Sequence, residues 1–185
     1  NFKKNIKILT MLAGDLNKCK IGLLADFLKS DVYIVFGSSF IKDSLLDHLV
    51  LKKAINIHMG ISPYYRGTDC NFWALYDNNP HLVGATIHLL SKGLDSGPIL
   101  YHAMSNLKND PFEYTMSTVK AAFYSIAERI KDKKLKRQKL WLEKEKKKGN
   151  LYWKYNYWKD KQNLGTYYTG IILKKNYTDS SNDSL

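Results

Sequence analysis

The stretch that decides the fold runs from Asn56 to Gly67 and reads Asn-Ile-His-Met-Gly-Ile-Ser-Pro-Tyr-Tyr-Arg-Gly. It continues a strand-like run that starts at Lys53 and ends in a turn punctuated by proline and glycine. Side chains two positions apart on a strand share a face, so Asn56 and His58 should point the same way. They should do so at the end of a strand, which is where open α/β sheets bind their ligands.

Two segments further along the chain carry related signals: residues 84–88 read Gly-Ala-Thr-Ile-His, and residues 94–99 read Leu-Asp-Ser-Gly-Pro-Ile. The pattern predicts strands over 83–90 and 99–105, joined by a loop that contains Asp95. An amide, an imidazole and a carboxylate together can stabilise an oxyanion and move a proton. Taken alone, Asp-Ser-Gly is an ordinary turn, and we interpret His88 as a half-buried sheet histidine.

The rest of the chain predicts an alternation of strands and helices. Strands are expected over 6–12 and 31–36, and helices over 21–28, 44–51 and 69–76, the last with an apolar face of Phe72, Trp73, Leu75 and Tyr76. Such an alternation favours a mostly parallel sheet with helices on both sides.

One helix has strong end signals. Asp110 suits its N-cap, Pro111 its first turn and Glu113 the capping-box position. Apolar residues then recur at helical spacing, and this face is expected to pack on the sheet; they are Met116, Val119, Phe123, Ile126 and Ile130.

Composition restricts the class of protein. A chain of 185 residues with 44% hydrophobic residues can bury a core. Cys19 and Cys70 have neither disulfide-framework nor metal-ligand spacing, which indicates a reducing compartment and no metal. No apolar run approaches the about 20 residues of a membrane span, and nothing resembles a signal peptide. We expect a cytoplasmic protein that does not bind membranes.

In register, the three motifs resemble the folate-dependent formyltransferases, a family that includes the enzymes acting on methionyl-tRNA, glycinamide ribonucleotide and sugar amines. The resemblance extends over the middle hundred residues or so, from Asp31 to Ile130. It implies an α/β, Rossmann-like formyltransferase fold. Family members open with a glycine-bearing turn and further βα units, whereas this chain starts at Asn1 and has only Gly14 near its start. We therefore expect the fold to be incomplete at the N-terminus.

The resemblance also implies the chemistry. The family moves a formyl group from 10-formyltetrahydrofolate to an amine acceptor, and its catalytic trio corresponds here to Asn56, His58 and Asp95. The pteridine pocket corresponds to the space between residues 37–41 and the 91–95 loop. Phe40, Ile41 and Leu94 are the expected binding residues.

The acceptor stays open between a sugar amine and methionyl-tRNA, because the Pro-x-Tyr-Arg-Gly form ending at Gly67 resembles both subfamilies. Two alternative functions also fit the resemblance. One is a formyltetrahydrofolate hydrolase, which uses the same trio with water as the acceptor, and the other is a non-catalytic folate-binding relic. The oligomeric state is also open.

The C-terminal part has a different composition, so we divide the chain into a catalytic domain over 1–135 and a basic, aromatic-rich extension over 136–185 with a disordered end. Residues 131–161 contain 13 Lys or Arg against 4 Asp or Glu. Such a segment can bind nucleic acid, which makes a nucleic-acid-binding module a third hypothesis. Glu143 and Glu145 lie at helical spacing to lysines, so we favour a solvated helix, and tRNA is not the favoured partner.

Overall fold

The computed structural model describes residues 6–135, 154–159 and 165–171, the last two ranges as backbone. The predicted helix around Glu143 and the disordered end lie outside these ranges. In chain order the elements are the 3₁₀ helices η1 (Asp15–Asn17) and η2 (Ile21–Leu24), β1 (Ile34–Phe36), α1 (Asp43–Leu51), β2 (Ile55–His58), α2 (Cys70–Tyr76), η3 (Pro80–Leu82), β3 (Ala85–Leu89), β4 (Ile99–Ser105), α3 (Pro111–Lys131), β5 (Lys154–Lys159) and β6 (Gly165–Ile171).

The strands form one mixed sheet in the order β1-β2-β3-β4-β6-β5. Among the described strands only β1 and β2 run parallel, with α1 as their crossover, and the other neighbours are antiparallel. The predicted α/β class is correct, whereas the predicted mostly parallel sheet is wrong for these strands. The reason is local: residues 90–98 between β3 and β4 are too few for a helical crossover, so these strands form an antiparallel pair.

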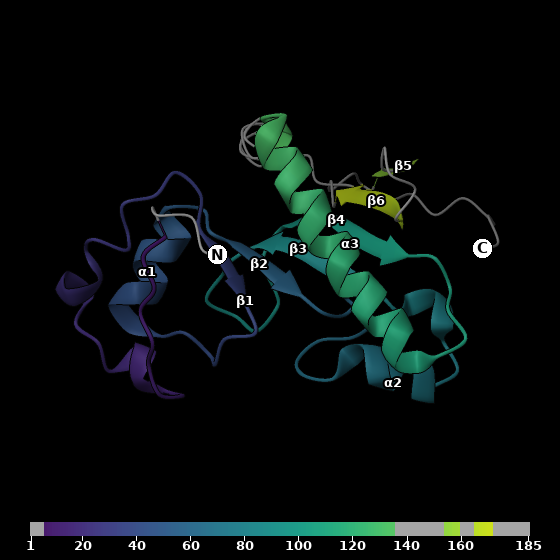
Figure 1. The fold of residues 1–185 in the computed structure, drawn as a ribbon, viewed down its shortest axis with the longest axis horizontal. Helices are drawn as coiled ribbons and strands as arrows, with labels where there is room; N and C mark the ends of the chain where they lie inside the picture. Colours follow the sequence, from purple (N-terminus) through teal and green to yellow (C-terminus); the bar gives the residue numbers. More distant parts are fainter. Residues whose placement is uncertain (1–5, 136–153, 160–164, 172–185) are drawn as a thin grey trace, which may run out of the picture.

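The two faces of β2, β3 and β4 differ in chemistry. One face packs beneath α3, which lies across the sheet in Figure 1. It is apolar, and its buried residues include Ile55, Ile57, Ala85, Ile87 and Tyr101. We call it the apolar face. Alternation along the strands, together with the pairs Asn56–His88, His58–Thr86 and Thr86–His102, places these five residues on the opposite, polar face.

Helix α3 begins as predicted, because the Asp110 side chain accepts a 2.6 Å hydrogen bond from the Glu113 amide. The predicted packing stripe is wrong in part, since Met116, Phe123 and Ile130 are exposed. The residues that α3 buries are mostly small or polar: Tyr114, Thr118, Ala121, Ala122, Ser125 and Ile126. Small side chains let the helix approach the sheet closely, which hydrophobic periodicity alone does not reveal.

Helix α1 packs on the side of β1 opposite to α3, and its Leu45, Leu46 and Leu49 belong to a second core cluster there. Two predictions before β1 are wrong. Residues 6–12 form no strand, and none of the described strands pairs with them. The predicted helix over 21–28 is reduced to η2 followed by turns, consistent with the poor helix propensity of Gly22.

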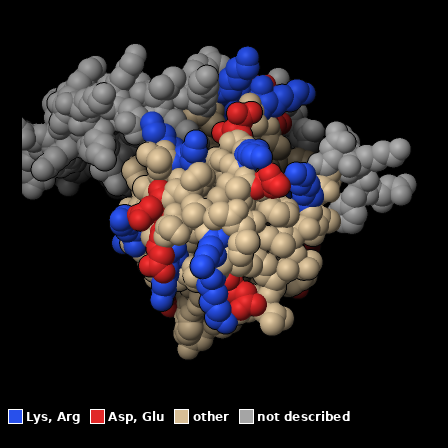
Figure 2. Space-filling model, turned by 90° about the vertical axis from the view of Figure 1, so that its left-hand side faces the viewer, with Lys and Arg blue, Asp and Glu red and all other residues tan. Residues whose placement is uncertain are grey.

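Helix α2 also contradicts one expectation. It buries Cys70, Asn71 and Ala74, whereas its aromatic rings Phe72, Trp73 and Tyr76 are exposed and contact one another. The surface carries both signs of charge. On the face shown in Figure 2, Lys and Arg side chains alternate with Asp and Glu around a broad uncharged area.

Within the described ranges, no helix is both long and apolar enough to cross a bilayer.

Candidate active site

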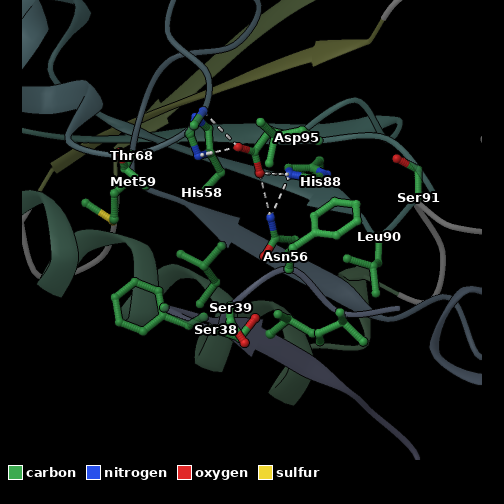
Figure 3. Close-up of a pocket in the computed structure, with 18 of the residues that line it drawn as sticks. Ser38, Ser39, Asn56, His58, Met59, Thr68, His88, Leu90, Ser91 and Asp95 are labelled. Carbon is green, nitrogen blue, oxygen red and sulfur yellow. Dashed lines mark hydrogen bonds and ion pairs between the residues drawn. The ribbon is translucent and has the colours of Figure 1, made fainter. Parts of the chain in front are cut away.

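Four polar side chains meet at the carboxyl end of β2 (Figure 3). Asn56 and His58 come from β2, His88 from β3 and Asp95 from the loop between β3 and β4. The structure therefore brings Asn56, His58 and Asp95 together, and it adds His88. We call these four residues the site quartet.

Asp95 is the centre of the quartet. Its Oδ1 accepts a 3.0 Å hydrogen bond from Asn56 Nδ2, and its Oδ2 accepts one of 3.1 Å from the Gly67 backbone amide. Burial opposes ionisation, but the His88 and His58 imidazoles and the Gly67 N–H favour the charged form, so the pKa of Asp95 falls below its usual value. Asp95 also has a positive φ of 41°, a strained conformation of the kind that clusters at functional sites.

Both ring nitrogens of His58 face an acceptor. Nδ1 lies 3.2 Å from Asp95 Oδ2, and Nε2 donates a 2.8 Å hydrogen bond to the Tyr65 carbonyl. Because neither acceptor carries a proton, this geometry suits the doubly protonated imidazolium. Gly60 leaves the room that the ring needs, since a Cβ there would lie 2.7 Å from Nε2 and 2.5 Å from the Cys70 Cβ.

His88 is a sheet histidine as predicted, but it is fully buried and not half-buried. It is 1% exposed, and its Nε2 lies 3.0 Å from Asn56 Nδ2 and 3.6 Å from Asp95 Oδ1. Its Nδ1 donates to the Leu89 carbonyl at 2.8 Å, which directs Nε2 toward Asn56 and Asp95. The alternation that linked Asn56 to His58 could have identified His88, had the register of β2 and β3 been known.

Gly97 lies directly against the Leu89 carbonyl that binds His88. A Cβ at Gly97 would lie 1.7 Å from the Leu89 oxygen, so only glycine allows the loop to pass this close to the strand. The Leu-Asp-Ser-Gly turn therefore supplies both the carboxylate of the quartet and the space for the His88 partner.

A cavity of about 710 Å³ opens beside the quartet, and Asn56, His58, His88 and Asp95 line one end of it. The three predicted binding residues Phe40, Ile41 and Leu94 all line it as well, Ile41 buried and the other two exposed. Ser38, Ser39 and Ser91 add hydroxyl groups to its wall. The volume and the mixed lining are typical of a pocket for a small organic ligand.

Cys70 lies close to the quartet but is poorly suited to nucleophilic attack. Burial, together with the nearby Asp95 and Asp69 carboxylates, raises the pKa of its thiol to about 11, so the thiolate is scarce at neutral pH. Across residues 6–135, no group of three or more His, Cys, Asp or Glu side chains has an arrangement that could hold a metal ion.

The fold and the quartet define an α/β protein with an amide–imidazole–carboxylate site at strand ends. Residues 20–130, more than half of the chain, match the formyl transferase family. This chain belongs to the formyl transferase family.

The similar proteins are distant or matched over short stretches. The methionyl-tRNA formyltransferase of Thermosynechococcus vestitus is 38% identical over 74 residues, and that of Thermodesulfovibrio yellowstonii is 35% identical over 63 residues. These matches cover 40% and 34% of this chain but only 22% and 20% of the two enzymes. The chain thus matches about a fifth of the length of these curated relatives.

Similar solved structures are matched at low sequence identity. The formyltransferase PseJ from Anoxybacillus kamchatkensis, solved with a formamido sugar nucleotide and tetrahydrofolate, is 24% identical with a TM-score of 0.45. That match covers 68% of this chain and 62% of PseJ. A 4-N formyltransferase from Francisella tularensis is 23% identical with a TM-score of 0.49, covering 62% of this chain and 47% of that protein.

Proposed function

We propose that this protein transfers a formyl group from 10-formyltetrahydrofolate to an amine acceptor, with Asn56, His58 and Asp95 as its catalytic residues. The observation that supports this most is the convergence of an amide, an imidazole and an ionised carboxylate at one end of the 710 Å³ cavity. Membership of the formyl transferase family supports the reaction type.

The proposed reaction is an acyl transfer. The amine nitrogen attacks the formyl carbon, and the carbonyl oxygen becomes an oxyanion. Collapse of this intermediate breaks the bond to the folate nitrogen, which leaves with a proton, while the attacking amine loses one. Asp95 can pass these protons on through a water molecule because, although it is partly buried, its neighbours keep it ionised at neutral pH.

The contacts of the quartet suggest how the oxyanion is stabilised. Asn56 Nδ2 bonds to both Asp95 Oδ1 and His88 Nε2. When Asp95 receives a proton from the amine, its attraction for the Asn56 N–H weakens and that donor can turn to the oxyanion. His58, whose nitrogens face Asp95 and the Tyr65 carbonyl, contributes through its positive charge and through its hold on Asp95.

The same cavity has a lining that suits the donor. Phe40, Ile41 and Leu94 offer apolar surface to a flat heteroaromatic ring, and residues 37–41 all line the cavity. We assign this part of the lining to the pteridine. The acceptor class, a sugar amine or methionyl-tRNA, and a cytoplasmic location remain part of the proposal.

The test measures consumption of 10-formyltetrahydrofolate with and without amines, by mass spectrometry of the products. Asn56→Ala should lower turnover roughly 10²–10³-fold, as removal of an oxyanion donor does, because this contact strengthens only when the oxyanion forms. His58→Ala should also lower turnover far more than folate affinity. Matched controls are Asn106→Ala and His81→Ala, both at exposed positions away from the cavity.

The outcomes separate the alternatives. A formylated sugar amine or formylated methionyl-tRNA identifies the acceptor class. Formate release that no amine redirects would replace the transferase with a hydrolase. Folate binding without turnover would reduce the protein to a binding module, and normal turnover with weakened folate affinity in Asn56→Ala would reverse the assigned roles.

A further inference from the structure

The loop over residues 59–69, which we call the site loop, holds the quartet through two backbone groups. The Tyr65 carbonyl accepts from His58 Nε2 at 2.8 Å, and the Gly67 amide donates to Asp95 Oδ2 at 3.1 Å. The orientation of the His58–Asp95 pair therefore depends on where the loop backbone is held. A residue that fixes this backbone would act on the site without touching a substrate.

The first half of the site loop is fixed to the polar face of the sheet. Thr86 Oγ1 accepts from the Ser62 amide at 2.9 Å and donates to the Gly60 carbonyl at 2.5 Å. His102 Nε2 donates to the Ser62 carbonyl at 3.2 Å. These contacts end at Ser62, three residues before the carbonyl that binds His58.

Tyr65 joins the second half to its surroundings in two ways: its backbone amide donates to the Ile61 carbonyl at 3.0 Å, and its side chain binds groups outside the loop. Its hydroxyl donates to Asp77 Oδ2 and accepts from Asn79 Nδ2, both at 3.0 Å. Asp77 is the C-cap of α2 and Asn79 the N-cap of η3, so the hydroxyl bridges two element ends. The Tyr65 ring also packs against the small core cluster of Ala74, Val83 and Tyr114. Tyr65, Asp77 and Asn79 together form what we call the Tyr65 clamp.

We propose that the Tyr65 clamp is a positioning device for the reaction: it holds the Tyr65 carbonyl against His58 Nε2 and thereby keeps the imidazole aligned on Asp95. The proposal assigns a role to Asp77 and Asn79, which line no part of the cavity. As a statement about catalysis it rests on the proposed formyl transfer, but its structural claim does not.

The first test is hydrogen exchange at the His58 ring, measured by NMR on protein labelled with ¹⁵N-histidine. Tyr65→Phe removes both hydroxyl contacts and leaves the ring, and Asp77→Ala removes one of them at an exposed position that should not affect folding. In both variants the Nε2 proton should exchange with water about 2- to 10-fold faster, because a net hydrogen bond is weakened.

Two comparisons make this result specific. Tyr64→Phe is the matched control, because Tyr64 is exposed and its hydroxyl makes no hydrogen bond to any described residue. The backbone amides of Ile55 and Ile57 in β2 report global opening, and their exchange should not accelerate with that of His58. Two results would overturn the proposal: an equal increase in the exchange rates of all these protons, or an unchanged exchange rate of the Nε2 proton in both clamp variants.

The second test is kinetic. Tyr65→Phe and Asp77→Ala should lower kcat roughly 3- to 10-fold and leave KM for the folate unchanged, because the clamp acts on alignment and not on donor binding. Unchanged kcat with an accelerated Nε2 proton would limit the clamp to a structural role and refute its part in catalysis. Absence of any formyl transfer by the unaltered protein would refute the proposed function, and the exchange measurement would still decide whether the clamp holds His58.

Discussion

The two faces of β2, β3 and β4 are built from alternating residues of the same strands, yet they are buried by different means. The apolar face is covered by a regular element, α3, through side chains as small as Ala121 and Ala122. The polar face is covered by irregular chain, the site loop and the loop that contains Asp95. All five residues of β3 are buried, so burial does not distinguish the faces.

The two faces differ because a helix and a loop present different groups to the sheet. A helix satisfies its own backbone groups and presents only side chains to the sheet, so it suits an apolar face. A loop has spare carbonyls and amides, and here these bind His58, Asp95 and His102. A polar sheet face therefore needs loops above it, and loops leave room for a cavity. We therefore expect substitutions on the two faces to have different kinds of effect.

The largest expected effect is on the polar face. Asp95→Asn keeps the shape of the side chain but removes its charge, and turnover should fall about 10²–10⁴-fold, the range for loss of a proton-transfer group. Steady-state kinetics with 10-formyltetrahydrofolate measure it, with the exposed Asp26→Asn as control. A variant that retains more than a tenth of the turnover would remove Asp95 from the mechanism.

The next effect concerns the apolar face. Ile87 is fully buried under α3, and Ile87→Ala should lower the free energy of unfolding by about 2–5 kcal/mol through lost burial and a residual cavity. Turnover of the folded fraction should stay within about twofold of the original, since Ile87 points away from the cavity. Urea unfolding provides the measurement, and the exposed Leu107→Ala is the control. Loss of turnover without loss of stability would erase the distinction between the faces.

The smallest effect is a pH dependence within the polar face itself. His102 is buried, and this lowers its pKa to about 4 despite its hydrogen bond to the Ser62 carbonyl. The unfolded chain, with a histidine pKa near 6.5, binds more protons between these values, so stability should rise with pH from about 4 to 6.5, by at most about 3 kcal/mol.

Urea unfolding across that pH range checks this prediction in the original protein and in His102→Gln, which should show a flatter profile. Asp95 does not account for the slope, because its pKa is lowered from 3.8 and its contribution is lost only at more acidic pH. An equal slope in the variant would show that another group is responsible.

Much of the site could be predicted from the sequence. The spacing of Asn56 and His58 predicted their common face, and the turn chemistry around Asp95 predicted that it lies in a loop. The resemblance to the formyltransferases implied that Asp95 joins them and implied the pocket residues. The three expected pocket residues, Phe40, Ile41 and Leu94, line the cavity. Strand and helix positions from β1 to α3 were largely correct, because strong local signals such as the Asp110 cap act within a few residues.

Other features depended on partners far away in the sequence. Tertiary packing decides three of them: the direction of β3 and β4, the outward aromatic rings of α2 and the small buried residues of α3. Hydrophobic periodicity carries no information about which surfaces pack together. The role of His88 needed the register that pairs it with Asn56 across 32 positions.

The sequence by itself determined which chemical groups are available and which of them share a face, because side-chain alternation is a property of the single strand. Only the tertiary structure decided their partners. His58, His88 and His102 are one residue type on one polar face, yet the first pairs with a carboxylate, the second with an amide and the carbonyl of the next residue, and the third with a loop carbonyl. The physical reason is that a histidine's hydrogen bonds depend on the atoms brought within 3 Å or so of its ring, and those atoms come from loops that the strand sequence does not specify.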